Sequence, residues 1–416
     1  MITAAAGAHA GAQVLSTLFP EGVPGYGTQP GVTVLSRRHP ELDPLGLRAG
    51  AFRVLPRLEE SFGYDDNVLG GSPKHGSWTL STRPSVLVGS DWSRHAFAAY
   101  VSLNNTVYPN LPAQNRTDGT VFAGGTIEIG RDRLTLSASH ISTHQDRTQL
   151  DALPTDSPVA VSIQDARAAY ELRSGAWTWT PNVQASHWHY GGTTIQGVPV
   201  SQSYRDRNVL QGGLTVRYEF APQRNLVLVT RGIGQRYTQP TPGQPSSDSS
   251  GVQVLVGLDY DDEAVWRYRL LVGGETRWFA NPAYRSHSGI IAEAEAIWTP
   301  TGMTTVRGSL SRGFQDAAQE GVSGYTYTTA RLRIDHELTR QVILSATGGL
   351  QFASYFQGGR QWGYGLGAGV TWVMNRSVRF SATYDLGGVQ GNPTGIGLVG
   401  SDYSRNIALL TVRLGL

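Results

Sequence analysis

The sequence predicts an all-β protein, a transmembrane antiparallel up-and-down β-barrel of about 18 strands, with 16 as the alternative count. Three observations lead to this prediction. From Ala51 to Leu416, runs of about 12 to 17 residues alternate apolar and polar side chains with a period of two. The connections between these runs are alternately short and long. No stretch approaches ~18 consecutive apolar residues, which excludes a helical membrane span.

The composition agrees with a barrel and excludes several classes of site. Gly 51, Trp 10 and Tyr 18 supply turn residues and interfacial aromatics. Lys+Arg 34 against Asp+Glu 32 gives a net charge of +2, which is too balanced for nucleic-acid binding by electrostatics alone. Cys is 0, so disulfides, thiolate metal sites and cysteine nucleophiles are excluded. Lys74 is the single lysine, and the other basic residues are arginines that bind carboxylates in a fork.

Residues 1–50 are expected to form a periplasmic extension. Residues 1–13 lack a basic segment and a full apolar segment, although Ala8-His9-Ala10 has the form of a cleavage site. We therefore expect the remnant of a signal peptide, which has either been trimmed already or lacks its beginning because the true start of the protein lies upstream. Residues 14–50 are rich in Gly and Pro and show no helical or strand period. Residues 51–416 are the predicted barrel, whose position in the outer membrane requires export.

The pattern predicts an even number of strands, as bacterial single-chain barrels require. The expected strands are 51–68, 77–91, 94–109, 117–130, 132–146, 159–174, 176–190, 203–220, 225–237, 250–261, 264–280, 284–299, 302–315, 322–337, 341–356, 360–374, 376–388 and 402–416. These exceed the ~5 to 6 residues usual in soluble sheets, which argues against a sandwich. Short turns such as 130–132 and 339–340 are expected on the periplasmic side, and long links such as 146–159 and 387–401 on the outer side.

Alternation assigns one face of each strand to lipid and the other to water. In strand 264–280, Trp266, Leu270 and Val272 alternate with Arg267 and Arg269. Tryptophans at the ends of apolar bands predict two interfacial belts. Strand 225–237 gives no clear face, because both of its alternating sets are apolar.

The predicted functional site is the charged inner wall of a wide aqueous channel. Inward aromatics, among them Tyr100, Trp188, Tyr325 and Tyr327, are expected either to stack on sugar rings or to fill space. The predicted pore-lining residues are Arg167, Glu171, Arg173, Arg207, Arg217, Arg267, Arg269, Glu275, Arg277, Glu293, Glu295, Arg331, Arg333 and Asp335.

Some residue clusters suggest chemistry, and each has a simpler interpretation. His140, Ser142 and His144 share one face of strand 132–146, just above the expected outer belt, and would place a base near a hydroxyl. No third residue in the sequence is evident to orient that base, so we expect no enzyme. His187 and His189 could bind a metal, but are expected to lie at the outer interface; no cofactor is predicted. Asp65-Asp66-Asn67 is expected to be a solvated loop tip.

Residues 32–50 and the first strand, which ends in Tyr64-Asp65-Asp66-Asn67, resemble the family called putative β-barrel porin 2. The resemblance spans nearly the whole chain, but only the entry segment is specific. It implies an outer-membrane protein, often associated with exopolysaccharide export, with no catalytic residues to transfer.

Together these features predict a pore for exopolysaccharide or other polar solutes. The alternatives are an outer-membrane lipid or lipopolysaccharide hydrolase and a structural or adhesive barrel. The expected partners are outer-membrane lipids, a polysaccharide and a periplasmic export partner.

Overall fold

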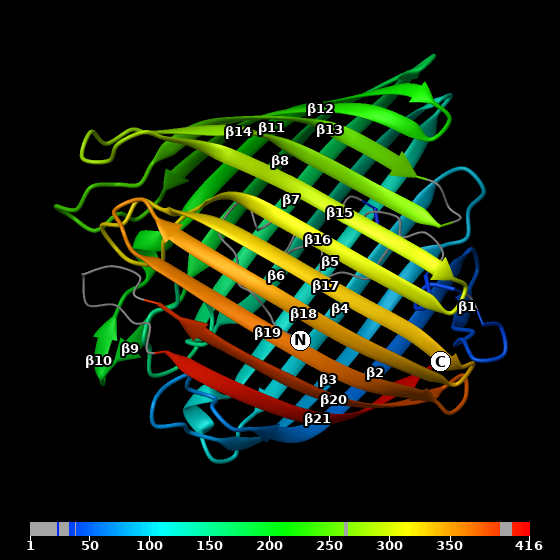
Figure 1. The fold of residues 1–416 in the computed structure, drawn as a ribbon, viewed down its shortest axis with the longest axis horizontal. Helices are drawn as coiled ribbons and strands as arrows, with labels where there is room; N and C mark the ends of the chain where they lie inside the picture. Colours follow the sequence, from blue (N-terminus) through cyan, green and yellow to red (C-terminus); the bar gives the residue numbers. More distant parts are fainter. Residues whose placement is uncertain (1–22, 25–32, 38, 262–264, 392–401) are drawn as a thin grey trace.

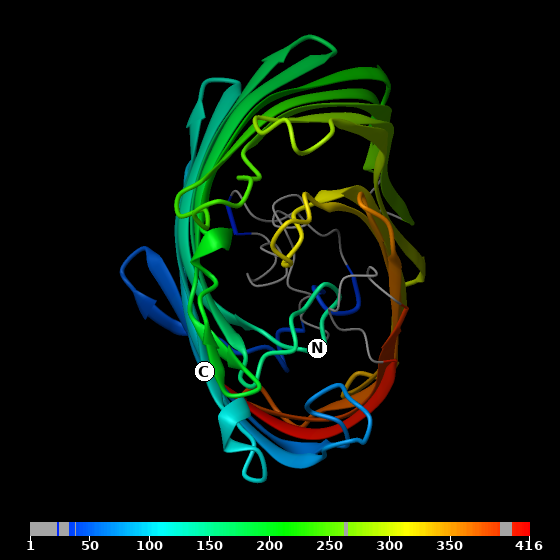
Figure 2. The same cartoon turned by 90° about the vertical axis from the view of Figure 1, so that its left-hand side faces the viewer.

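The computed structural model describes residues 23–24, 33–37, 39–261, 265–391 and 402–416. Within these residues, 18 long strands form one closed antiparallel barrel, in which each strand pairs with its neighbours in the chain and the last pairs with the first. Figure 1 shows the tilted strands from the side, and Figure 2 shows a closed ring that is longer than it is wide, with connecting segments inside it. The predicted fold is confirmed.

The barrel strands have 12 to 16 residues each. They are β2 (Phe52–Asp65), β3 (Ser77–Ser90), β4 (Ala96–Val107), β5 (Arg116–Ile129), β6 (Asp132–Gln145), β7 (Val159–Ser174), β8 (Trp177–Tyr190), β11 (Arg207–Ala221), β12 (Arg224–Tyr237), β13 (Ser249–Asp261), β14 (Trp266–Phe279), β15 (His287–Thr301), β16 (Thr304–Gln315), β17 (Tyr325–Thr339), β18 (Val342–Tyr355), β19 (Arg360–Val373), β20 (Val378–Gln390) and β21 (Tyr403–Gly415).

Short elements lie outside the ring of long strands. β1 (Leu47–Ala49) pairs with the start of β2, and β9 (Thr193–Ile195) and β10 (Val198–Val200) form a small hairpin. Two 3₁₀ turns, η1 (Pro112–Gln114) and η2 (Ser203–Arg205), lie in long connections. No helix in the described part of the chain is long and apolar enough to cross a membrane.

Long and short connections gather at opposite ends of the barrel, as predicted. We call these the loop end and the turn end. Several strand limits differ from the predicted ones by a few residues: β11 begins at Arg207, β15 continues through a bulge to Thr301, and β20 continues to Gln390. The expected link 387–401 is therefore shorter, and its residues 392–401, like the predicted leader 1–13, lie outside the described residues.

The outer face of the wall is apolar and carries aromatic side chains near both ends. Trp266 stacks on Trp298 near the turn end, with ring centroids 5.3 Å apart. Phe62 stacks on Trp78 near the loop end at 5.1 Å. Aromatic rings with one apolar and one polar edge stabilise a barrel at both boundaries of the hydrocarbon layer.

Strand β12, whose faces the sequence left unassigned, is apolar on both sides for two different reasons. Leu226 and Leu228 are 51% and 39% exposed on the outer face. Val227 and Val229 are 3% and 1% exposed and pack with inward residues of β13, β14 and β15, including Leu255. The inner wall therefore contains an apolar sector in addition to its charged ones.

Candidate functional site

Charged side chains on the inner wall are held in pairs between nearby strands. On β12 and β15, Arg231 donates two hydrogen bonds to the Glu293 carboxylate. On β11 and β13, Arg217 Nε lies 3.3 Å from Asp259 Oδ2. Pairing offsets the desolvation of each charge and fixes its position, because arginine presents its donors in a rigid fork.

A buried carboxylate near the loop end joins four strands. Asp316 follows β16, and its Oδ1 accepts a hydrogen bond of 2.8 Å from Arg277 Nη1 on β14. Its Oδ2 lies 3.3 Å from Arg207 Nε on β11 and accepts a 3.2 Å hydrogen bond from Gln235 on β12. This carboxylate therefore fixes the start of loop 316–324 against the facing wall.

Loop 146–158, between β6 and β7, reaches the opposite wall of the barrel. At its tip, Asp151 Oδ1 accepts a 3.0 Å hydrogen bond from the Tyr355 hydroxyl of β18. Asp151 Oδ2 accepts a 2.6 Å bond from the Ala318 amide. The Tyr204 hydroxyl donates to the Ala318 carbonyl at 2.6 Å. Asp151, Ala318 and Tyr204 belong to three different loops, the last of them the connection between β8 and β11. We call their meeting point the loop junction, and it crosses the lumen.

The environment of the loop junction changes the acidity of its side chains. Burial of the carboxyl group raises the pKa of Asp151 to about 7, against the opposing effects of the Ala318 amide and Arg205. Burial also raises the pKa of Tyr204 to about 12, so this hydroxyl remains a donor at neutral pH. The Asp151 carboxyl group is therefore close to half ionised at neutral pH.

A cavity of about 330 Å³ lies in the lumen beside the loop junction. Its lining combines aromatic rings, among them Tyr100, Trp188 and Tyr325, with charges of both signs. Part of the aromatic surface is already covered, because the Arg205 guanidinium lies 4.0 Å from the centre of the Tyr190 ring. The fourth aromatic named from the sequence, Tyr327, packs in the wall with Ala353 and Tyr355.

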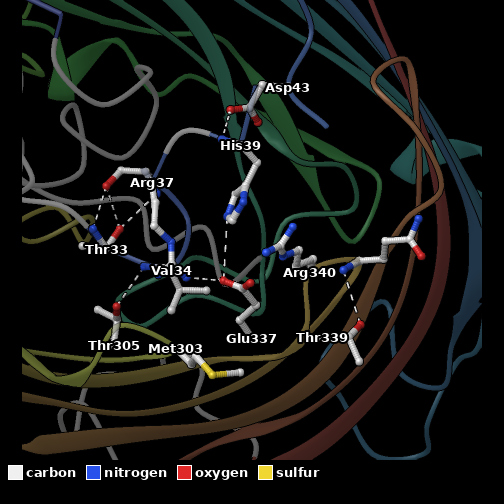
Figure 3. Close-up of polar contacts among 12 residues, drawn as sticks. Thr33, Val34, Arg37, His39, Asp43, Met303, Thr305, Glu337, Thr339 and Arg340 are labelled. Atoms are coloured by element: carbon white, nitrogen blue, oxygen red, sulfur yellow. Dashed lines mark hydrogen bonds and ion pairs between the residues drawn. The ribbon is translucent and has the colours of Figure 1, made fainter. Parts of the chain in front are cut away.

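The described residues 33–37 and 39–46 lie against the barrel at its turn end, and we call them the strap (Figure 3). The Val34 amide donates to Thr305 Oγ1 at 2.9 Å, and Arg37 pairs with Glu337. Further upstream, Val23 is buried in an apolar cluster with inward residues of the wall, including Phe122. Val23 therefore lies inside the barrel.

The structure places the predicted pore-lining residues on the inner face and brings most of them into pairs. Arg207 and Arg277 meet at Asp316, and Glu275 lies beside Arg277. That these residues line a conducting pore stays a prediction. The remaining members are Arg167, which pairs with Asp165; Glu171, which pairs with Arg173; Arg217, which pairs with Asp259; Glu293, which pairs with Arg231; Arg333, which pairs with Asp335; Arg269, opposite Glu295 in register; Arg267; and Arg331.

Several lumenal residues were missed. Arg231 follows the same alternation as Val229 and could be assigned only once β12 had a defined inner face. Arg413 alternates with the apolar residues of the last strand, a signal that was present in the sequence. Asp151 and Asp316 lie in loops, where alternation gives no information about direction.

One interpretation of a sequence cluster was wrong. Asp65 and Asn67 are 1% and 0% exposed, not parts of a solvated tip. Arg405 of β21 binds the Asp65 carboxylate, and the Asp66 carboxylate accepts hydrogen bonds from Asn406. Barrel closure brings these partners together from opposite ends of the sequence.

His144, His187 and His189 lie near the loop end, and each has a different partner. His144 Nδ1 is 2.8 Å from Asp118 Oδ1, which supplies the orienting group that the sequence did not reveal. Ser142, however, makes no side-chain hydrogen bond to His144 among the described residues. His187 contacts Asn208 at 2.8 Å and His189 contacts Asp206 at 2.7 Å, so these two histidines have different partners.

Comparison with known proteins identifies the family. The model of the family described as "Putative beta-barrel porin 2" matches residues 39–416. The chain belongs to this family. A porin family, a closed barrel and an apolar outer face together place it in the outer membrane.

Solved structures of similar fold are distant in sequence, and curated proteins give no match. OpdK from Pseudomonas aeruginosa, solved with vanillate, is 11% identical, with 87% of this chain and 99% of that chain covered and a TM-score of 0.45. OccK9 (OpdG) from the same organism is 10% identical, with 88% and 98% covered and a TM-score of 0.46. The FrpB iron transporter from Neisseria meningitidis is 10% identical, with 89% and 83% covered and a TM-score of 0.46.

Proposed function

We propose that this porin-like barrel passes exopolysaccharide or other polar solutes across the outer membrane. The observation that supports this most directly is the inner wall, where charged pairs and aromatic rings surround a cavity of about 330 Å³. Aromatic faces offer apolar contact to sugar rings, and paired charges exchange hydrogen bonds with hydroxyl groups. A polymer with many hydroxyl groups and no apolar tail would lose little solvation in such a channel.

Planar-bilayer recordings of the refolded protein test this proposal. We expect discrete conductance steps, and a partial block of the current by maltoheptaose but not by glucose at the same mass concentration. Because the loop junction narrows the lumen, a variant lacking residues 147–157 serves as a second measurement. Silence of both proteins, with the barrel shown to be folded, would contradict the proposal.

An outer-membrane lipid hydrolase is the second candidate, and the contact between His144 and Asp118 is the observation that favours it. An oriented histidine could activate a neighbouring hydroxyl as a nucleophile. Release of fatty acid from phospholipid in mixed micelles should then be abolished in Ser142→Ala and in His144→Ala. Absence of activity in the wild-type protein would remove this candidate.

A further inference from the structure

Four arginines gather around a single glutamate at one side of the barrel. Glu59 on β2 is the register partner of Arg83 on β3 and of Arg413 on β21. Arg413 is in turn the partner of Arg379 on β20. Arg413 and Arg379 face the lumen, because Leu414 and Phe380, which alternate with them, are exposed on the outer face. Their register partners Glu59 and Arg83 share this inner face.

The glutamate is engaged by two of the arginines. Glu59 Oε1 lies 2.6 Å from Arg413 Nε, and its Oε2 lies 3.7 Å from Arg83 Nη1. Arg57, two residues before Glu59 and on the same face, makes no ion pair within the described part of the chain. It lies within electrostatic range of Arg413 and Arg379, which repel it, and of Glu59, which attracts it. This sector of the wall therefore carries an excess of positive charge.

A second carboxylate reaches the sector from the strap. Asp43 Oδ1 accepts a hydrogen bond from Arg379 Nη2 at 3.3 Å, and the same Nη2 lies 3.4 Å from the Leu42 carbonyl. Asp43 Oδ2 accepts a 2.6 Å hydrogen bond from the His39 amide, which holds the carboxylate in place. The side chains of Arg379 and Asp43 are 25% and 37% exposed, so solvent and solute can reach both.

We propose that Arg57, Arg379 and Arg413 form a binding site for the oxyanion group of a solute, a carboxylate or a phosphate. In the structure, the Asp43 carboxylate of the strap is hydrogen-bonded to one of these three arginines, Arg379, and so acts there as a tethered anion. Guanidinium groups on adjacent strands offer forked donors to such a group, and charge-assisted bonds of this kind are the strongest in proteins. The proposal rests on the proposed pore for the arrival of its solute.

The pair of Asp43 and Arg379 gives a test that a structural role would fail. Asp43→Asn removes the tethered competitor, so an added anion should bind more tightly. Arg379→Gln removes a donor, so the same anion should bind about tenfold more weakly. If the ion pair only fastened the strap, both substitutions would act in the same direction.

Isothermal titration of the full chain in detergent measures this directly, with glucuronate and inorganic phosphate as probes and glucose as the uncharged counterpart. Arg224→Gln is the matched control, because Arg224 lies near the turn end over the Tyr260 ring, outside the site. Tighter binding of glucuronate or phosphate by Asp43→Asn and weaker binding by Arg379→Gln supports the site. The preferred probe shows whether the group is a carboxylate or a phosphate.

Equal binding of glucose and glucuronate overturns the proposal, as do changes of the same sign in the two variants. Heat-modifiable gel migration confirms that each variant is folded. Bilayer recordings on the same preparations separate the two claims. If the barrel does not conduct but the two variants change anion binding in opposite directions, the pore is refuted and the anion site stands. If the barrel conducts but the variants do not change binding in this way, the anion site is refuted and the pore stands.

Discussion

Conductance should rise as the pH increases from 5 to 8, because Asp151 closes the loop junction most firmly when it is protonated. The carboxyl group of Asp151 has a pKa raised by burial to about 7, whereas its ordinary value is 3.8. A raised pKa in the closed state means that the closed junction is favoured at low pH and loses this advantage as the pH rises through 7. The charges acting on the carboxylate are those of Arg205, which attracts it, and Asp316, which repels it.

The size of the effect follows from the two pKa values. At a pKa of about 7, about 1% of the Asp151 carboxyl groups are ionised at pH 5 and about 90% at pH 8. A carboxyl group that returns to its ordinary pKa on release makes opening easier by about 2.5 kcal/mol over this range. That corresponds to nearly a hundredfold change in the ratio of open to closed junctions.

Macroscopic conductance of many inserted barrels, recorded from pH 5 to pH 8, measures the change. Asp151→Asn should conduct equally at all pH values, since the amide does not ionise. Asp156→Asn is the matched control in the same loop, because hydrogen bonds from the Gly197 and Gln196 amides lower the pKa of Asp156 and keep it ionised throughout. Conductance that falls with pH, or a pH dependence retained by Asp151→Asn, would refute the reasoning.

Three further outcomes test the wall, its loops and the strap. Asp316→Asn should lower stability by on the order of 3 kcal/mol, since it weakens the carboxylate between two buried arginines, and the midpoint of heat-modifiable migration should fall; an unchanged midpoint would contradict this. Leu332→Arg on the lipid face should lower the free energy of unfolding by about 2 to 4 kcal/mol, and Arg331→Leu on the lumenal face should lower it much less. Urea titration in vesicles measures both, and equal losses would mean that the two faces are misassigned. Glu337→Gln should loosen the strap and raise single-channel conductance, with an unchanged current as the contrary result.

The strap and the loop junction act at opposite ends of one channel. Glu337 and Arg379 hold the strap at the turn end, whereas Asp151 and Asp316 hold loops at the loop end. Each of these two attachments consists of a few polar contacts and a small number of ion pairs. Such contacts are weak in comparison with the strand pairing of the barrel, so each can open without loss of the fold.

The sequence by itself determined the architecture, because a membrane-spanning sheet imposes a rule on every residue. Apolar side chains must alternate with polar ones along each strand, so faces, strand number and the side of each turn were all present in the order of residues. The charged residues of the inner wall, such as Arg269 and Glu293, followed from the same rule. The faces of strand β12 could not be assigned from the sequence, because Val227 and Val229 pack in an apolar patch inside the barrel.

Only the tertiary structure decided what crosses the lumen. Asp151 meets Tyr355 across the barrel, Asp65 meets Arg405 through closure of the first strand on the last, and Asp43 meets Arg379 through the path of the strap. Loops have no periodic constraint, and partners hundreds of residues apart carry no local pattern. Their contacts exist because the closed ring decides which strands face each other across the lumen. Alternation along a single strand carries no information about that arrangement.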